Sequence, residues 1–600
     1  MYDYREIWKQ RIAEIITKLL PPNETVSPEQ VVAEKPPNPE MGDLGFPMFS
    51  FAKLLKKAPA QIAQSVAAEL PGSVAIGPYV NVRLNRGEAA KDILGELAET
   101  VKDKIPDIIR DTGGAFGRPD TLKGSRIMVE FSSPNTNKPL HLGHLRNDVL
   151  GESISRILAA CGAEIRKVCI INDRGIHICK SMLSYKEHGE GKTPESEGIK
   201  SDRFVGDWYV AFSQSLKEET EALEKGGLTR KEAEAQAPAM VKAQELLRNW
   251  EAGDNETVEL WKRMNAWAID GWKETYRRTG VSFDQYYFES QTYLLGKDEI
   301  LKGLEKGIFY REEDGSIQVD LTAEKLDKKV LLRKDGTSIY ITQDLGTAIN
   351  RHKDWLFDRL VYVVGSEQQY HFKVLFILLQ KLGYEWAKDL YHLSYGMVNL
   401  PEGKMKSREG TVVDADDLID SLKEMAMEEI RGKEREEAVG DAEAASEKIA
   451  IGALHYFLLQ VSPVKDMLFD PKESLSFNGN TGPYLQYMGA RISSLMRKAG
   501  ERSGKPRFEL LTGDAEWELV KTVGAYTDAV AAAAEGMDPS LLTAYLYELA
   551  KTFSRFYHDC PVLSAEDPDL VSARLELCRI VLAVLRDAMN LVCIPFLEVM

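Results

Sequence analysis

Residues 127–156, which read IMVEFSSPNTNKPLHLGHLRNDVLGESISR, constrain the fold more than any other stretch of the chain. Residues 127–131 are mostly apolar and predict a short buried strand, whereas residues 132–135 favour a turn over a continued ladder. From His144 onward, apolar residues recur at three-to-five-residue steps, close to a helical period. The stretch therefore predicts a strand, a polar loop and a helix in succession.

A second strand, residues 166–171, follows that helix and ends in Asn172 and Asp173. A strand, a helix and a strand at this spacing predict a βαβ unit and a parallel sheet. Polar residues at the carboxyl ends of such strands face the ligand crevice, so both are candidate site residues, although turn formation also explains them. Residues 183–275 are rich in Glu, Lys and Ala, which predicts a helical insertion with solvated charged faces.

His141, Leu142, Gly143 and His144 lie where the predicted helix begins. The first turn of a helix has backbone N–H groups without intrahelical partners and the positive end of the helix dipole, so it attracts phosphate. A glycine there lets a base or a phosphate approach the backbone closely. A motif this short also fits two surface histidines beside a helix-start glycine.

Further along, VSFDQYYF predicts that the sheet resumes near Gly280, and an Asp335-Gly336 turn predicts a hairpin between VLLRK and SIYIT. Asp344 is predicted to cap the helix that follows. At the start of the chain, an opening helix, a Pro-rich turn, a helix over about 51–70 and the strand YVNVRLN predict a small α+β module. After Glu443 the pattern is helical throughout.

Composition limits the class of protein. The chain has 600 residues, of which 44% are hydrophobic and 28% are charged, enough for several cores. No run approaches the roughly 18 apolar residues of a membrane span, and the opening helix lacks the apolar core of a secretory signal, so we expect a cytoplasmic protein without membrane contact. The net charge of −17 argues against indiscriminate nucleic-acid binding but allows one basic surface for a specific partner.

The six cysteines form no CxxC pair. Isolated cysteines usually act as small core hydrophobes, so we expect no disulfide framework, no structural zinc and no other metal site.

The run from Glu130 through Lys138 to Arg146 resembles the nucleotide signature of class I aminoacyl-tRNA synthetases, in the version found in the arginyl-tRNA synthetase family. The resemblance implies an α/β, Rossmann-type catalytic domain over 120–430 with a helical insertion at about 183–275. It also implies an N-terminal α+β tRNA-contacting domain over 1–115 and an all-helical anticodon-binding domain over 443–600.

The resemblance also implies an arginine site. Tyr340 and Asp344 would face the substrate, with the carboxylate on its guanidinium and the ring along its methylenes, and Glu130 would be the second carboxylate. Asn135 and Gln368 would hold the α-amino and carboxylate ends. A planar guanidinium pairs with carboxylates through parallel hydrogen bonds that lysine cannot reproduce.

For ATP with Mg²⁺, the resemblance places the adenine against Gly396, Met397 and Val398, and the phosphates at His141, Gly143 and His144. The run KMKSR resembles the second class I motif, Lys-Met-Ser-Lys-Ser. Lys404 matches its first lysine, whereas Lys406 stands third and Ser407 replaces the second lysine. Lys138, just before the histidine motif, is expected to compensate. The predicted catalytic residues are therefore His141, His144, Lys138 and Lys404.

Tyr484, Tyr487 and Arg491 share one face of a predicted helix, where they could stack on unpaired bases or pack in a core. The resemblance assigns them, with Met600, to the anticodon loop of tRNA(Arg). It implies that the protein converts L-arginine and ATP to arginyl-adenylate and pyrophosphate, then transfers the arginyl group to the tRNA. We expect the protein to act as a monomer.

Three alternatives stay open. The cysteinyl enzyme shares the helical end domain but usually has zinc-binding cysteines, which this sequence lacks. A nucleotidyltransferase with the same histidine motif would have no use for the region after Glu443. A non-catalytic tRNA-binding relative would not need both intact motifs, and an ATP-binding assay would distinguish it.

Overall fold

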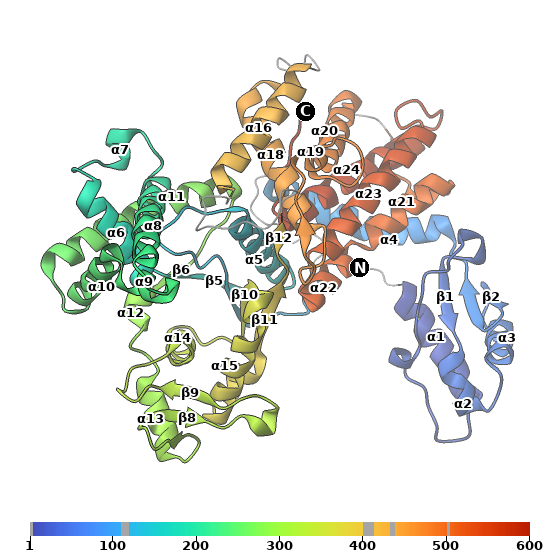
Figure 1. Cartoon of the computed structure of the whole chain (residues 1–600). Helices are drawn as coiled ribbons and strands as arrows, with labels where there is room; N and C mark the ends of the chain where they lie inside the picture. Colours follow the sequence, from blue (N-terminus) through green and yellow to red (C-terminus); the bar gives the residue numbers. More distant parts are fainter. Residues whose placement is uncertain (1–3, 110–118, 400–412, 433–438, 501–503) are drawn as a thin grey trace. The chain divides into compact units, whose positions relative to one another are not determined.

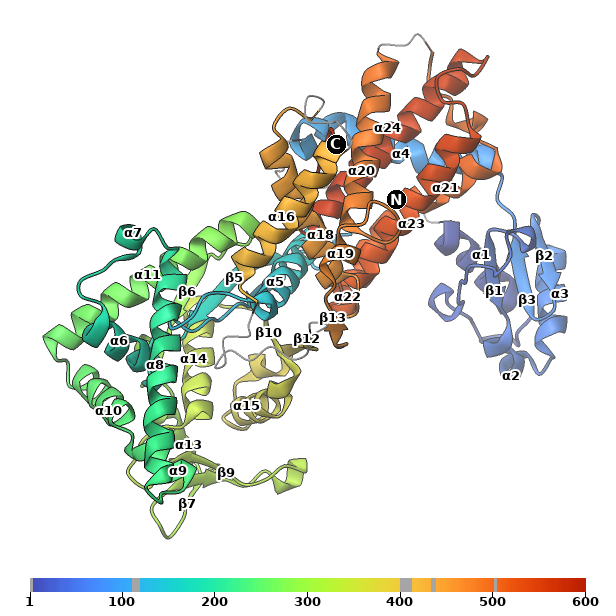
Figure 2. The same cartoon turned by 45° about the horizontal axis from the view of Figure 1, so that its top comes forward.

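The structure is a computed structural model that describes residues 4–109, 119–399, 413–432, 439–500 and 504–600. The chain divides into two compact units. Figures 1 and 2 label most of the helices and strands named below. The first unit comprises Met1–Gly117, Leu495–Thr527 and Leu549–Val584. The second comprises Arg118–Ser494, Asp528–Glu548 and Leu585–Met600.

The first unit begins with the predicted α+β module. Its antiparallel sheet has the order β1 (Leu44–Pro47), β3 (Tyr79–Val82), β2 (Ser73–Ile76) and shares an apolar core with α1 (Tyr4–Lys18) and α3 (Pro59–Glu69). The helix predicted over about 51–70 is interrupted. Its first part, α2 (Ala52–Leu55), ends at Lys56, which has φ of 51°, and Pro59 begins the next helix because proline suits a first turn.

Within this same unit, the module is joined to helix α21 (Asp514–Gly524). The Asp43 side chain accepts hydrogen bonds from Trp517 Nε1 at 2.7 Å and from the backbone N of Leu84 at 3.0 Å. The unit also contains α4 (Arg86–Ile109) and parts of α23 (Ser540–Asp559) and α24 (Pro568–Leu591).

The second unit is built on a five-stranded parallel sheet. The strand order is β11 (Leu390–Tyr395), β10 (Arg359–Gly365), β4 (Arg126–Glu130), β5 (Glu164–Ile171), β6 (Gln285–Phe288). The winding direction reverses between β4 and β10, and ligands of such sheets bind beyond the carboxyl ends of the strands at that point. The predicted α/β fold with parallel strands is confirmed.

Helices cover both faces of this sheet. On one face, Met128 and Tyr362 share a core with α14 (Tyr340–Asp354) and α15 (Gln369–Lys381). On the other, Phe131 packs on Gly151 of α5 (Leu142–Ala160), where a Cβ atom would lie 2.1 Å from the ring. Because successive strand residues alternate between faces, Glu130 points toward α14.

Residues 183–275 are mostly helical, as the sequence predicts. The long helices of this region pack together (Figure 2) around a cluster of aromatic rings that includes Tyr185, Phe204 and Trp267. They are α6 (Ile176–His188), α8 (Ser201–Lys225), α10 (Pro238–Glu251) and α11 (Asn255–Thr279).

The predicted hairpin forms only next to its turn. Leu332 and Ser338 form an antiparallel bridge, and Arg333 N donates to Thr337 O at 3.0 Å. SIYIT does not continue as a strand: β9 (Lys329–Leu332) pairs with β8 (Ile317–Val319), and the chain enters α14 at Tyr340. Asp344 therefore lies in the second turn of α14 and does not cap it. The chain forms a helix here and not a second hairpin strand, because Ile341, Leu345 and Ala348 recur at helical spacing and are buried together.

The predicted helical character of the last third is confirmed. In the second unit the chain forms α16 (Ala415–Gly432), α18 (Ala442–Leu459) and most of α20 (Gly482–Ala499). Among the residues that the structure describes, no helix is long and apolar enough to cross a membrane.

Candidate active site

The histidine motif forms the start of α5, two residues earlier than predicted. His141 caps the helix: its Nδ1 accepts a hydrogen bond from Gly143 N at 3.1 Å, and its own N donates to His144 Nδ1 at 3.1 Å. The ring centroids lie 3.9 Å apart. Since both Nδ1 atoms accept, the proton of each neutral ring is on Nε2, which makes Nε2–H a donor for a ligand.

Burial determines the charges of this motif. Burial, together with the nearby Lys138, lowers the pKa of His141 to about 3. Burial, His141 and Lys138 lower the pKa of His144 well below its usual value, and burial lowers the pKa of Lys138. Near neutral pH the motif therefore offers two uncharged N–H donors and one ammonium group.

The residues that follow the KMKSR motif contact the histidine motif. Asp414 forms an antiparallel bridge with His141, Leu142 N donates to Val413 O at 3.3 Å, and Ala415 N donates to Leu140 O at 3.0 Å. Residues 413–415 therefore lie beside the start of α5. Lys404, Lys406 and Ser407 lie outside the described residues.

Gly396, Met397 and Val398 lie beside a second segment of chain. β12 (Val398–Asn399) runs parallel to β13 (Met467–Leu468), and Met467 N donates to Met397 O at 2.9 Å. In this register the N–H and C=O of Val398 point away from β13. They form one donor and one acceptor side by side, which matches the hydrogen-bonding edge of adenine.

Glycine is required at position 396, because a Cβ atom there would lie 2.5 Å from the backbone carbon of Lys465. Arg146 of α5, which the sequence analysis did not single out, fixes the same region. Its buried guanidinium donates to Met397 O at 3.3 Å, Pro463 O at 3.1 Å and Lys465 O at 2.8 Å. An arginine two residues beyond the motif carries no sequence signal of this role.

The predicted arginine-binding residues lie at the same carboxyl edge of the sheet. Tyr340 and Asp344 are one turn apart on α14, and Tyr340 is 75% exposed. Asp344 Oδ2 lies 2.6 Å from His371 Nε2 on α15. Gln368 ends the short helix η5 (Ser366–Gln368) after β10 and is exposed.

The loop after β4 carries the remaining candidates. Asn135 is exposed and bridges Asn172 at the end of β5. Glu130 is buried and paired with Arg351 of α14, so one of the two predicted guanidinium ligands already has a cationic partner. Asp173 is structural, since it accepts hydrogen bonds from Ser290 N and Oγ at 2.8 and 2.7 Å.

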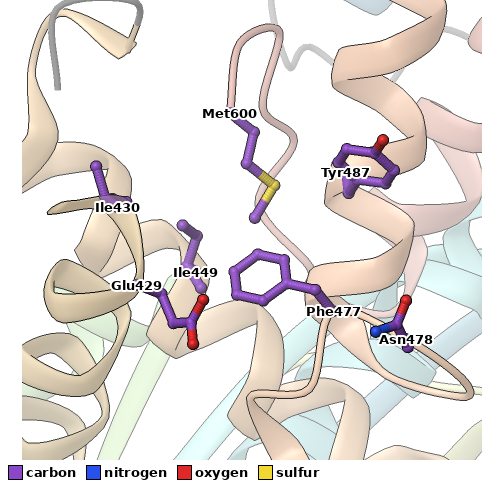
Figure 3. Close-up of a pocket in the computed structure, with 7 residues that line it drawn as sticks. All are labelled: Glu429, Ile430, Ile449, Phe477, Asn478, Tyr487 and Met600. Carbon is purple, nitrogen blue, oxygen red and sulfur yellow. The ribbon is translucent and has the colours of Figure 1, made fainter. Parts of the chain in front are cut away.

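The predicted tRNA residues converge only in part. Tyr487 of α20 and Met600 line one cavity of about 300 Å³ (Figure 3). Tyr484 pairs instead with Tyr547, at 6.1 Å between ring centroids. Arg491, two turns after Tyr484 on α20, is partly exposed. The other residues that line the cavity are Glu429, Ile430, Ile449, Phe477 and Asn478.

Three family models match the chain. They are the catalytic domain of tRNA synthetases class I (R) over residues 108–471, the DALR anticodon binding domain over 485–600, and the arginyl tRNA synthetase N terminal domain over 6–84. The arginine–tRNA ligase of Treponema denticola is 59% identical, with 100% of both chains covered. The chain belongs to the arginyl-tRNA synthetase family.

Two further comparisons agree with membership of the arginyl-tRNA synthetase family. The arginine–tRNA ligase of Treponema pallidum is 54% identical over 100% of both chains. The solved arginyl-tRNA synthetase of Thermus thermophilus aligns with a TM-score of 0.79 at 25% identity, again over 100% of both chains. The family and the fold predicted from the sequence are therefore confirmed.

Proposed function

We propose that this chain is an arginine–tRNA ligase. It joins L-arginine to ATP as arginyl-adenylate, releases pyrophosphate, and transfers the arginyl group to the 3′-terminal adenosine of tRNA(Arg). The observation that carries the proposal is that one carboxyl edge of the parallel sheet bears both the His141–His144 donor pair and the Asp344 carboxylate. A phosphate site and a guanidinium site at one edge are what adenylation of arginine needs.

Positioning and charge stabilisation supply the catalysis, as in other reactions at phosphorus. The substrate carboxylate attacks the α-phosphorus while the Nε2–H groups of His141 and His144 donate to phosphate oxygens. Lys138 supplies positive charge, and Lys404, with Lys406 and Ser407 beside it, is assigned the same task on the pyrophosphate. The adenine edge forms hydrogen bonds with the backbone N–H and C=O of Val398, next to Gly396 and Met397.

Recognition of arginine rests on Asp344, which pairs with the guanidinium through two parallel hydrogen bonds, and on Tyr340, which covers the methylenes. Glu130, though paired with Arg351, is the second carboxylate of the pocket. Asn135 and Gln368 bind the α-amino and carboxylate ends. A substrate without a guanidinium would cover the Asp344 carboxylate without replacing its hydrogen bonds to water, so it should bind more weakly than arginine.

Mg²⁺ is proposed to enter with ATP. Mg²⁺ prefers oxygen ligands and is usually held by one or two carboxylates and the substrate phosphates. Across the described part of the chain, no three His, Cys, Asp or Glu side chains form a group that could hold a metal ion. The phosphate oxygens would therefore be its main ligands, and its charge would offset theirs.

For tRNA binding we propose Tyr487 and Met600 at the cavity of Figure 3, with Tyr484 and Arg491 along α20. An aromatic ring and a thioether beside Asn478 suit an unpaired base. We keep the boundaries 1–115, 120–430 with its insertion, and 443–600 as the proposed tRNA-contacting, catalytic and anticodon-binding domains. We also propose that the chain works as a monomer in the cytoplasm, where tRNA is charged.

Exchange of labelled pyrophosphate into ATP, measured for each of the twenty amino acids with and without tRNA(Arg), tests this function. We expect exchange with arginine and with none of the other nineteen amino acids. Exchange with a different amino acid would overturn the Asp344 pocket, and no exchange under any condition would favour a non-catalytic tRNA-binding protein.

A further inference from the structure

His371 lies in the first turn of α15, three residues after Gln368, and contacts the proposed arginine pocket from outside it. Its Nε2 is 2.6 Å from Asp344 Oδ2. An ionised carboxylate only accepts hydrogen bonds, so Nε2 carries the hydrogen and donates it. The imidazole ring is 5.8 Å from the ring of the buried Phe372, edge on, and the His371 side chain is 28% exposed.

We propose that His371 is a positioning residue that orients the Asp344 carboxylate for the guanidinium of the substrate and so sets the selectivity for arginine. The proposal rests on the arginine pocket of the proposed function and names the group that holds its key carboxylate.

The orientation of Asp344 has to be imposed, because its side chain is 41% exposed on the surface of α14. Two parallel hydrogen bonds to a planar guanidinium form only when the carboxylate plane is fixed within a few tens of degrees. The bond from His371 occupies one side of Oδ2 and leaves Oδ1 and the rest of Oδ2 for the substrate, since a carboxylate has about four acceptor positions.

The surrounding charges explain why a histidine suits this place. Asp344 is close enough to Glu130 and Glu289 to help raise the pKa of both carboxyls, in each case after the larger effect of burial. Glu130 is paired with Arg351, and Arg174 acts on Glu289 in the opposite direction to Asp344. Both arginines are permanently charged, whereas a histidine can hold a carboxylate without carrying charge. Arg174 is also paired with Glu251 at 3.0 Å, so carboxylates outnumber the fixed cations in this group.

The test is pyrophosphate exchange by the full chain with saturating tRNA(Arg). His371→Ala should raise the KM for arginine about 10- to 100-fold, the effect of one hydrogen bond to a charged group, and leave the KM for ATP nearly unchanged. His371→Gln, which keeps an N–H donor near the Nε2 position, should restore most of the loss. His371→Phe, a ring without a donor, should behave like the alanine variant.

Asp344→Ala separates the two levels of the proposal. It should raise the KM for arginine further, and adding His371→Ala to it should cost nothing more, because the two residues act through one interaction. If Asp344→Ala leaves the KM for arginine unchanged, the pocket itself is misassigned. If Asp344→Ala raises it but His371→Ala does not, or if His371→Gln fails as badly as alanine, the role of His371 alone is overturned.

Discussion

Lys138, His141 and His144 show at the scale of single residues how burial prepares a phosphate site. The same desolvation that keeps both imidazoles neutral also lowers the pKa of the Lys138 ammonium. The hydrogen bonds inside the motif fix which ring nitrogen donates. The site therefore presents oriented donors without the electrostatic cost of three buried positive charges.

The lowered pKa of Lys138 gives a pH prediction. The ammonium is charged below its pKa, so its charge is lost as pH rises through a value below that of an ordinary lysine. The kcat/KM for ATP, which reports on the free enzyme, should fall correspondingly early on the alkaline side. Lys138→Arg, always charged, should remove that fall, whereas Lys138→Met should lower kcat/KM at every pH. An identical alkaline fall in the arginine variant would show that another group titrates.

Helix α14 is the central element of the proposed arginine pocket, since it carries Tyr340, Asp344 and Arg351. Near its middle, the backbone of α14 closely approaches the backbone of residues 295–296. At Gly346, a Cβ atom would lie 2.2 Å from Gly296 N and 2.3 Å from the backbone carbon of Leu295. The position of Asp344 thus depends on a glycine contact that carries no chemistry of its own.

Gly346→Ala should therefore displace α14. We expect a loss of about 1–3 kcal/mol in the free energy of unfolding and a raised KM for arginine, because backbone atoms cannot move aside cheaply. Gly95→Ala in α4 is the matched control: its Cβ would meet nothing within 4 Å, so about 0.5–1 kcal/mol of stabilisation is expected. Denaturant unfolding and pyrophosphate exchange measure both. Wild-type stability and KM in Gly346→Ala would refute the role of this contact.

Hydrophobic periodicity predicted most helices and strands, but it could not predict which residues far apart in the sequence contact each other. The strand, loop and helix around the histidine motif follow from periodicity within thirty residues or so. The predicted hairpin stops after the Leu332–Ser338 bridge, because the burial of Ile341 and Leu345 at helical spacing favours a helix from Tyr340 onward. The partner of Glu130 is 221 residues away, and that of Asp344 is 27 residues away on another helix. Arg146 joins α5 to carbonyls more than 250 residues later. Nothing in a single sequence links such positions.

At the scale of the whole molecule, the sites proposed for chemistry and for tRNA binding use different helices. The proposed adenylation site includes residues of α5, α14 and α15, whereas the cavity at Tyr487 and Met600 involves α16, α18 and α20. The two tasks should therefore be separable by substitution.

Tyr487→Ala should raise the KM for tRNA by about 5- to 100-fold, the range expected when one stacked base is lost, and leave the KM for arginine unchanged at saturating tRNA. Tyr391→Ala, on the strand β11 and 39% exposed, is the control for loss of an exposed tyrosine and should change neither value. Steady-state aminoacylation measures both constants. An unchanged KM for tRNA in Tyr487→Ala would remove this cavity from the tRNA site.

The most direct test of the account is a crystal structure with a non-hydrolysable arginyl-adenylate analogue. The account predicts that the guanidinium makes two hydrogen bonds to Asp344, with His371 still bound to Oδ2, and that the adenine edge meets the N–H and C=O of Val398. A guanidinium directed away from α14, or an adenine bound elsewhere than at Val398, would contradict it.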